Sequence, residues 1–512
     1  MISIQHVSVA QLALLSLILI PGYYVATVIY NVYFHPLRNF PGPFWWRATH
    51  IPWAWHGFRG TLTRRICELQ REYRGTVLRV APNELHFFRS QAWNDIYGHK
   101  SPSGNTGNLP KTLQRTRETV NGATNVFITG DRETHRRMRR LLAHAFSDKA
   151  LTEQLPLINT YIDLLITNLR QKASQGSGSA IVDVVQWYNF TTFDIIGDLT
   201  FGEAFGCLRD GVMHSWISNV FFSVKDSSLD RAARVFPRPI YDYIMSLRPQ
   251  SGVNAQKEEF LFASEKAKTR IESGNIDRVD FMSYILKHND ERGMTMPEIE
   301  SNSTAIILAG SETIAAAATF LSGITFLLLK NPTVYAKLRD IIRSTFEDEA
   351  AMTPTALTNI EYFTACIEES LRFYPSVPLT GVDRITEPEG SHIDGMFIPG
   401  NTYVVTPQMA MNMSEDNFAD PEKFVPERWL KDDACPERYR GDDRKAMQPF
   451  SFGPRNCLGK NLAYVEMRVI FARMLWNFDM QLMDNEQDWR DQPIFILWEK
   501  KPLNVKLTIR QS

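Results

Sequence analysis

One segment of the sequence predicts a helix long enough to cross a whole domain. Its start, Thr295-Met-Pro-Glu298, has the pattern of a capping box with a proline in the first turn. The helical pattern continues to Lys330, where Asn331-Pro332 would end it. At 1.5 Å per residue, about 35 residues give a helix of roughly 50 Å, so the fold must be built around it.

Two settings would suit the apolar part of this helix, residues 304–329: a second membrane span or the interior of the protein. Its single charged side chain is Glu312. An acidic residue at the centre of a span costs roughly 2.5–3.5 kcal/mol. The frequent Ala, Ser and Gly residues also suit close packing against protein or a ligand. We therefore expect a buried central helix.

The composition indicates a large folded protein. The 512 residues are 44% hydrophobic, which excludes disorder as the main state, and the net charge of −1 gives no basic footprint for nucleic acid. Five cysteines without a CxxC pair argue against a disulfide framework and against a structural zinc site. They favour a reducing compartment.

Helical periodicity dominates from about residue 60 to 380, and strand-like patterns occur at 76–88, 392–406 and 501–509. This indicates a fold that is mainly α with small β-sheets (α+β), as a single large helical domain. Loops are expected at 101–130, 175–180 and 248–254.

The N-terminal segment has no Asp, Glu, Lys or Arg before Arg38, and it is apolar from Val7 to Phe34. About 20 apolar residues span a bilayer as a helix, so we expect a transmembrane anchor over 1–34. A cleaved signal peptide would need a positive start, and a buried core helix would be amphipathic. Prolines then predict a stiff hinge over 35–45 and a globular domain over 46–512. Because arginines follow the anchor, that domain is expected in the cytosol.

A small-residue motif, Ala309-Gly-Ser-Glu-Thr313, lies inside the long helix. Glycine costs roughly 1 kcal/mol there relative to alanine, so a compensating contact is expected. Thr313 can bond the carbonyl of Ala309 and open a notch beside Glu312, which would suit proton delivery. A crossing point with another helix is the alternative reading.

A second motif pairs Glu369 with Arg372 on one face of a predicted helix, and Arg428 in the later PERW sequence could join them. Alone, such a pair is usually a solvated surface contact.

The third motif is PFSFGPRNCLGK at 449–460, which contains Cys457 at the start of a predicted helix. The positive helix end lowers a thiol pKa, while Gly453 and Gly459 allow a tight loop and close approach of a flat ligand. An idle thiol would not explain the glycines and Arg455, and a nucleophile would need a nearby base. A metal ligand is favoured.

Together these motifs resemble the cytochrome P450 family of haem-thiolate monooxygenases. The stretch from Phe450 to Gly459 matches the family's FxxGxRxCxG loop, Ala309–Thr313 matches its oxygen-activating helix segment, and Glu369-x-x-Arg372 with PERW matches its structural triad. The anchor and hinge look like a microsomal member. The YFHPLRNFPGP start and residues 193–206 resemble fungal enzymes of secondary metabolism.

The resemblance implies a role for each motif residue around haem b. Cys457 would be the proximal iron ligand, and Glu312 and Thr313 would deliver protons to bound dioxygen. Glu369, Arg372 and Arg428 would brace the core. One departure is His135, where the family often has tryptophan. The residues implied to contact the haem or its propionates are His135, Arg139, Arg384, Phe450, Arg455 and Gly459.

The resemblance also implies an NADPH-dependent monooxygenase that hydroxylates or epoxidises an apolar small molecule of polyketide or terpenoid type. Electrons would come from NADPH–cytochrome P450 reductase, with cytochrome b5 as a second donor, at the endoplasmic reticulum membrane. A haem-thiolate isomerase or dehydratase, and a non-catalytic haem-binding protein, are the alternatives. Candidate reductase contacts are Arg136, Arg137, Arg444, Lys445 and Lys460. Expected pocket walls are 101–128, 210–250, 377–382 and 494–498.

Overall fold

The computed structural model describes residues 9–100, 106–111, 119–248, 250–274, 277–289, 293–378, 380–484 and 486–511. At 9–17, 250–256, 308–316 and 432 it describes the backbone without the side chains.

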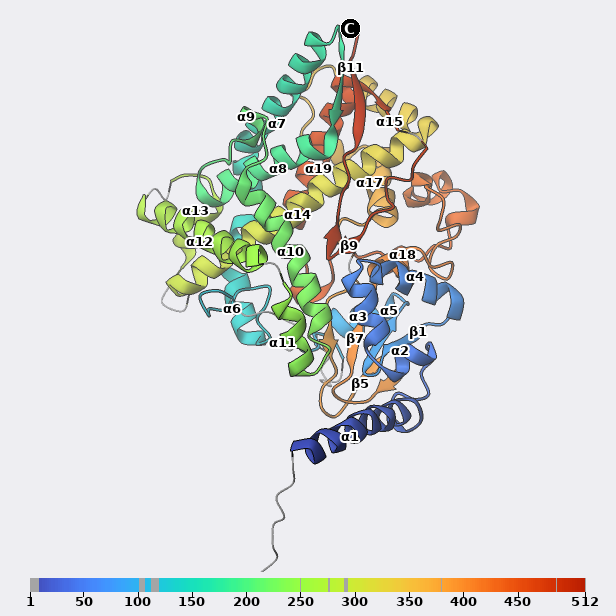
Figure 1. Ribbon diagram of the computed structural model, residues 1–512. Coiled ribbons are helices and arrows are strands. Elements are labelled where there is room, and N and C mark those ends of the chain that lie inside the picture. Colours follow the sequence, from blue (N-terminus) through green and yellow to red (C-terminus); the bar gives the residue numbers. More distant parts are fainter. Residues whose placement is uncertain are drawn as a thin grey trace, which may run out of the picture.

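Helices run through most of the described chain (Figure 1). The α-helices are α1 Val9–Ile29, α2 Phe44–Ala48, α3 Ile51–Phe58, α4 Leu62–Tyr73, α5 Gln91–Tyr97, α6 Arg132–Ala143, α7 Asp148–Gln175, α8 Val184–Phe201, α9 Cys207–Asp210, α10 Ser215–Ala233, α11 Arg238–Ser246, α12 Gln250–Glu272, α13 Phe281–His288, α14 Met296–Lys330, α15 Pro332–Thr345, α16 Pro354–Thr358, α17 Glu361–Phe373, α18 Gln408–Asn412 and α19 Lys460–Asn477. Shorter helical turns include the π-helical η1 Tyr30–Phe34 and the 3₁₀ turns η2 His144–Phe146, η3 Pro426–Trp429, η4 Asp432–Ala434, η5 Glu437–Tyr439, η6 Arg444–Ala446 and η7 Gly453–Arg455.

The predicted long helix is confirmed as α14, which crosses the middle of the molecule (Figure 1). Both bonds of the capping box are present: Thr295 Oγ1 accepts from Glu298 N at 3.4 Å, and Glu298 Oε2 accepts from Thr295 N at 2.9 Å. The helix packs most extensively on α8, and its described apolar side chains between Ala317 and Leu328 are buried. It is therefore a central core helix.

Small sheets lie beside the helices. The three strand-like patterns are confirmed: 76–88 folds into the hairpin β1–β2, 392–406 contains β5, β6 and β7, and the C-terminal segment contains β11. The sheet orders are β1-β2-β7-β4, β3-β11-β8, β5-β6 and β10-β9. The strands are β1 Val77–Ala81, β2 Glu84–Phe87, β3 Ser179–Asp183, β4 Arg384–Ile385, β5 Ser391–Ile393, β6 Met396–Ile398, β7 Tyr403–Val405, β8 Phe478–Leu482, β9 Ile494–Phe495, β10 Leu497–Trp498 and β11 Asn504–Ile509.

Two predicted loops are wrong in part. Residues 179 and 180 of the loop at 175–180 belong to β3, because Ala180 pairs with Leu507 of the distant strand β11. The loop at 248–254 contains the start of α12 at Gln250. Its Ser-Gly pair falls in the first helical turn, where the N–H groups have no intrahelical partner. The low helix propensity of serine and glycine therefore does not prevent the helix from starting there. The described parts of 101–130 contain no helix or strand, as expected, and the remainder lies outside the described residues.

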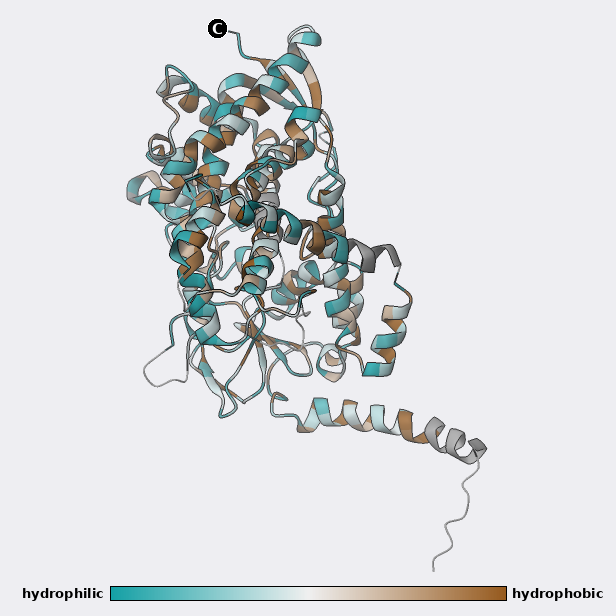
Figure 2. Ribbon diagram, turned by 90° about the vertical axis from the view of Figure 1, so that its left-hand side faces the viewer, coloured by the Kyte–Doolittle hydropathy of each residue, from teal (hydrophilic) through white to brown (hydrophobic). Residues whose placement is uncertain are grey.

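The N-terminal helix α1 extends beneath the globular body (Figure 2). Its described apolar side chains are largely exposed, among them Leu19 and Tyr23. Within the described ranges, no helix combines the length and the apolarity needed to cross a bilayer.

The hinge predicted at 35–45 is not helical over 35–43, but its last two residues begin α2, and the segment is packed against the globular body. Pro41 O accepts from Arg79 N of β1 at 2.7 Å. A Cβ at Gly42 would lie 2.2 Å from Arg79 O, so the two backbones are in direct contact.

A buried acid on α19 predicts a pH-dependent stability. The Glu466 carboxylate is fully buried, neither oxygen has a hydrogen-bond partner in the described part of the chain, and burial raises its pKa to about 8. The folded state therefore binds more protons than the unfolded state between its ordinary pKa of 4.5 and about 8. As the pH rises through this window, the unfolding free energy of the wild type should fall by about 1.4 kcal/mol per pH unit relative to that of Glu466→Gln.

Thermal unfolding midpoints of both proteins at matched scan rate, from pH 5 to 9, measure this difference. Glu347→Gln, which alters an exposed acid, should show no such trend. A Glu466→Gln advantage that does not change with pH would contradict the buried-acid assignment.

Candidate active site

The loop before α19 holds Cys457 in a closed turn. Cys457 N donates to Phe450 O at 2.8 Å, and Asn456 N donates to Gly453 O at 3.0 Å. From α6, Arg139 Nη1 donates to Asn456 O at 2.7 Å, and its Nη2 donates to the Asn456 side chain. The thiol is therefore fixed by the loop's own backbone and by one arginine from a distant helix.

The two glycines of this loop have different roles. Gly453 has a φ of 74°, and a Cβ there would lie 2.0 Å from Tyr97 O, so the backbone itself requires glycine. A Cβ at Gly459 would meet no atom closer than Phe146, at 3.9 Å. The protein's own packing therefore does not require Gly459, and the space beside it suits a close ligand. The tight loop expected of these glycines is therefore confirmed at Gly453, and close approach of a ligand stays a prediction for Gly459.

Opposing influences act on the Cys457 thiol. Burial raises its pKa, while the Gly459 N–H, Arg139 and Lys460 lower it to a smaller extent. A coordinated metal ion deprotonates a thiol outright. This setting therefore suits a thiol that becomes a thiolate by binding a metal ion.

Basic side chains from four segments meet in one place. We call them the basic cluster, and its members are Lys111, His135, Arg139, Arg384 and Arg455. His135 and Arg384 are buried, and the other three are half-buried. Within the described chain, none of the five forms a salt bridge with a carboxylate.

The electrostatics of the basic cluster are those of crowded like charges. Burial lowers the pKa of His135 to about 3, with further lowering from Arg455, Arg139, Lys111 and Arg384. Burial and its neighbouring arginines lower the pKa of Lys111 to about 7 and that of Arg455 to about 10. Arg384 Nε has no hydrogen-bond partner in the described part of the chain. Buried charge of one sign calls for a counter-charge, and two carboxylates of a ligand would supply it.

Lys111 is a member of the basic cluster that sequence reasoning missed. It forms an antiparallel β-bridge with Arg384, and its ammonium group donates to Phe127 O. Its neighbours in sequence carry no motif, and pairing with a strand far along the chain brings it to the site. Arg455, by contrast, donates to Thr129 O at 2.9 Å, so part of its donor capacity already ties the Cys457 loop to the segment before α6.

Glu369, Arg372 and Arg428 form a fully buried network and not a surface pair. Arg372 donates to both Glu369 oxygens at 2.8 Å from Nε and Nη2, and Arg428 Nε donates to Glu369 Oε1 at 3.2 Å. All three side chains have no exposed area. Arg372 Nη1 also donates to Asn412 O at 2.9 Å and Pro421 O at 2.8 Å.

A second acid, Asp442, completes this network and was not predicted. Its carboxylate accepts from Arg428 Nη1, so two buried acids balance two buried arginines. Trp429 Nε1 donates to Glu369 Oε2 at 2.9 Å. Glu369, Arg372, Arg428 and Asp442 together are called the buried charge network below. No local pattern marks Asp442, because it reaches Arg428 across several irregular turns.

The predicted proton-delivery residues lie on α14, which is helical through the Ala309–Thr313 motif. The side chains of Glu312 and Thr313 lie outside the described residues. Phe450 lies with its ring centroid 5.1 Å from that of Tyr464 on α19.

The geometry and the comparisons agree. The family model for cytochrome P450 matches residues 40–507. The chain belongs to the cytochrome P450 family. It is 44% identical over 94% of its length to cytochrome P450 monooxygenase aclL of Aspergillus oryzae, covering 95% of that protein. It is 39% identical over 95% of its length to averantin hydroxylase of Dothistroma septosporum, covering 89% of that protein. It is 40% identical over 94% of its length to trichothecene C-4 hydroxylase of Trichoderma arundinaceum, also covering 94% of that protein.

The P450 is therefore a monooxygenase, and its family implies a haem-thiolate cofactor, a redox partner and a small-molecule substrate. The site fits that cofactor: a partly buried thiol, an open glycine beside it and a basic cluster that has no carboxylate partner among the described residues suit a thiolate-ligated iron and two propionates. The isomerase, dehydratase and non-catalytic alternatives find no support among these relatives.

The five basic residues expected at a reductase contact differ in availability. Arg137 is engaged with Glu298 on α14, with contacts of 3.0 and 2.6 Å. Arg444 donates to Leu430 O at 3.2 Å. Arg136, Lys445 and Lys460 are exposed.

We predict that Arg372→Ala prevents formation of the holoenzyme, because it leaves Glu369 buried without two of the five hydrogen bonds that its carboxylate accepts. Breaking a buried pair costs about 3–5 kcal/mol. The haem-to-protein ratio and the thermal midpoint of the purified protein measure the loss. Arg238→Ala, which removes an exposed pair with Asp242 on α11, is the control and should load haem normally. A stable, fully loaded Arg372→Ala protein would show that the network is dispensable.

Proposed function

We propose that this P450 uses NADPH, through a membrane-bound reductase, to insert one oxygen atom of O₂ into an apolar small molecule of fungal secondary metabolism, of polyketide or terpenoid type. The observation that carries the proposal is the Cys457 loop linked through Arg139 to a basic cluster that forms no salt bridge with any carboxylate the structure describes. Two relatives named as hydroxylases, one for averantin and one for trichothecene C-4, support hydroxylation.

In this proposal, one group of residues binds the haem and a second group transfers protons. Cys457 would hold the iron by its sulfur, and Gly459 would leave room for the macrocycle. Arg139, Arg384, Arg455 and His135 would donate to the propionates, and Lys111 would add a positive charge beside them. When bound, haem supplies the iron that binds O₂ and the electron transfer that activates it.

Thr313 and Glu312 are proposed to hold and pass protons to the oxygen side of the site. A threonine hydroxyl that both accepts and donates can hold a water in place, and a nearby carboxyl group can exchange protons with it. The described backbone of α14 continues as helix through both residues, which keeps them on adjacent positions of one rigid element.

Membrane attachment at the endoplasmic reticulum, with the catalytic domain in the cytosol, is part of the same proposal. Apolar side chains stand exposed on α2, α3 and α11, at the end of the molecule where α1 lies (Figure 1). Trp45 is 64% exposed and Tyr243 66%. Aromatic residues of this kind favour the membrane interface. Release of the full chain from microsomes by alkaline carbonate would contradict the anchor.

Reductase docking is proposed on the side of the molecule that carries Lys460, next to Cys457. Lys445 and Arg136 are the other exposed candidates for this contact, whereas Arg137 is excluded by its pairing with Glu298. Basic surfaces of this kind steer an acidic partner and make the association rate sensitive to salt.

The experiment is reconstitution with a fungal NADPH–cytochrome P450 reductase and a panel of apolar polyketide and terpenoid scaffolds, in isotopically labelled O₂. We expect labelled product from at least one scaffold. Thr313→Ala should still bind haem but lower product formation by about 10²-fold and divert NADPH consumption to hydrogen peroxide.

Thr313→Ser keeps the hydroxyl and is the matched control, which should retain most of the coupling. Unchanged coupling in Thr313→Ala would refute the relay, and unlabelled product from the wild type would refute the monooxygenase proposal.

A further inference from the structure

Tyr97, the last residue of α5, touches both the Cys457 loop and the basic cluster. Its backbone oxygen lies against the loop, because it is the atom that a Cβ at Gly453 would meet. Its side chain is buried, and the guanidinium carbon of Arg384 lies over its ring, 5.0 Å from the ring centroid. One residue of α5 therefore connects the loop that carries the thiol with an arginine of the basic cluster.

The Tyr97 hydroxyl joins the backbones next to the β4–β7 pair. It donates to Val382 O at 3.0 Å and accepts from Thr406 N at 3.3 Å. Arg384 pairs with Val404 in this antiparallel ladder, so the same register brings Val382 opposite Thr406. The hydroxyl therefore bridges the two chains where the pairing of β4 with β7 ends.

The Tyr97 side chain thus acts on Arg384 at two points. Its hydroxyl fixes the backbone two residues before Arg384, and its ring lies against the guanidinium group. The negative face of an aromatic ring attracts a cation, most strongly when both groups are shielded from water, and Arg384 is also buried. Burial raises the pKa of Tyr97, and the charge of Arg384 opposes this increase, as expected for two groups in contact. The orientation of the guanidinium group is therefore restricted.

Other contacts hold α5 in place. Trp93, one turn before Tyr97, donates from Nε1 to Ala446 O of η6 at 3.0 Å, and its ring centroid lies 5.2 Å from that of Tyr97. Asp95 Oδ2 accepts from Asp394 N, in the turn between β5 and β6, at 2.9 Å. Because α5 is fixed on both sides, Tyr97 can set the distance between the Cys457 loop and Arg384.

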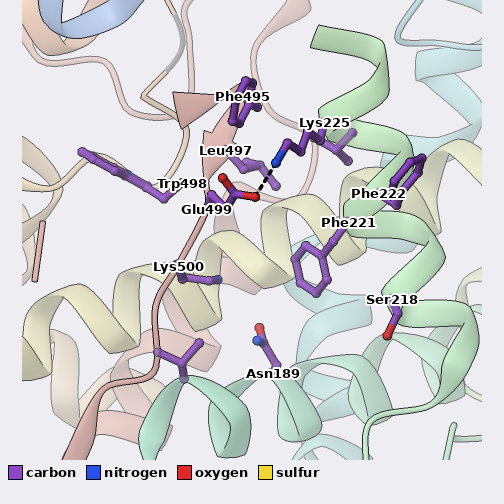
Figure 3. Close-up of a pocket in the computed structure, with 12 residues that line it drawn as sticks. Asn189, Ser218, Phe221, Phe222, Lys225, Phe495, Leu497, Trp498, Glu499 and Lys500 are labelled. Atoms are coloured by element: carbon purple, nitrogen blue, oxygen red, sulfur yellow. Dashed lines mark hydrogen bonds and ion pairs between the residues drawn. The ribbon is translucent and has the colours of Figure 1, made fainter. Parts of the chain in front are cut away.

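The largest aromatic-walled space near the central helix is built from different residues. A cavity of about 420 Å³ lies between α8, α10 and the β9–β10 hairpin, with Phe221 and Phe495 among its walls (Figure 3). It joins 210–250 and 494–498, two of the four segments expected to form pocket walls. None of the described residues that line it belongs to α5, the Cys457 loop or the basic cluster. Substitutions at Tyr97 therefore leave the walls of this cavity intact.

We propose that Tyr97 is a positioning residue for cofactor binding, which holds Arg384 at a fixed distance and orientation relative to the Cys457 loop. The thiol and the guanidinium group are thereby spaced to meet the iron and one propionate of the same haem. This inference rests on the contact between Arg384 and a propionate that is part of the proposed function. It does not depend on the substrate.

The test measures the rate at which the full-length, haem-loaded enzyme loses haem to an excess of apomyoglobin. Tyr97→Leu removes the ring and both hydrogen bonds and should accelerate haem release about tenfold. Tyr97→Phe keeps the ring and should accelerate it about threefold. Arg384→Met should also accelerate it about tenfold. In the Arg384→Met background, each Tyr97 substitution should change the rate less than twofold, because the side chain on which Tyr97 acts is gone. If Tyr97→Leu does not load haem, Tyr97→Phe provides the same comparison.

Tyr335 on α15 provides a matched control. Its hydroxyl accepts from Met480 N at 2.9 Å, and the guanidinium carbon of Arg339 lies 5.7 Å from its ring centroid. Tyr335→Leu should therefore lower the thermal midpoint, as Tyr97→Leu does, but leave the rate of haem release unchanged.

Three results would overturn the inference: no acceleration by either Tyr97 substitution, equal acceleration with and without Arg384, or an acceleration by Tyr335→Leu as large as that by Tyr97→Leu. An unchanged rate in Arg384→Met would overturn the proposed propionate contact and this inference with it. The carbon monoxide spectrum of each variant reports ligation by Cys457 independently, so failure of the Tyr97 role is distinguishable from failure of the proposed function.

Discussion

The buried charge network supports the structure on which the active site depends. Four fully buried charged side chains from α17, η3 and the turn before η6 neutralise one another. They also bind the backbone of the irregular stretch between Asn412 and Asp442, which has few regular hydrogen bonds of its own. That stretch leads directly into the Cys457 loop. A neutral network is stable in the core only when all of its groups are hydrogen-bonded. The segments that contribute to it must therefore fold together.

The second constraint is electrostatic and lies on the other side of that loop. Folding brings the basic cluster together from α6, β4, the Cys457 loop and the bridge at Lys111, although its lysine and three arginines all lower the pKa of His135. The same burial disfavours the Cys457 thiolate. A ligand with a central cation and two peripheral carboxylates resolves both costs at once. Folding and cofactor loading are therefore expected to be coupled.

Much of the fold could be predicted because its signals are local. The capping box at Thr295 and the Asn331-Pro332 stop define α14, and alternating patterns define β1, β2, β7 and β11. The start of strand β3 could not be predicted, because the Gly-Ser sequence at 176–179 is typical of a loop and pairing with β11 begins the strand at Ser179. The packing of residues 35–43 onto β1 is likewise a tertiary contact that prolines alone do not reveal.

The site shows the same division between local and distant signals. Cys457, Glu369 and Arg372 stand in motifs that can be recognised in sequence. Asp442 and Lys111 could not be found this way, because a long irregular path or a single β-bridge brings each to its partner. The tight loop at Gly453 could be predicted from its glycine, whereas the positive φ angle and the contact with Tyr97 that require it are visible only in the structure.

The central claim is that Cys457 holds a haem iron as a thiolate, and the carbon monoxide complex of the reduced protein tests it most directly. The account predicts the red-shifted Soret band of thiolate ligation in the wild type and in Cys366→Ala, which removes a different buried thiol. Cys457→Ala should lose this band. An ordinary imidazole-type spectrum in the wild type, or a red-shifted band that persists in Cys457→Ala, would contradict the account.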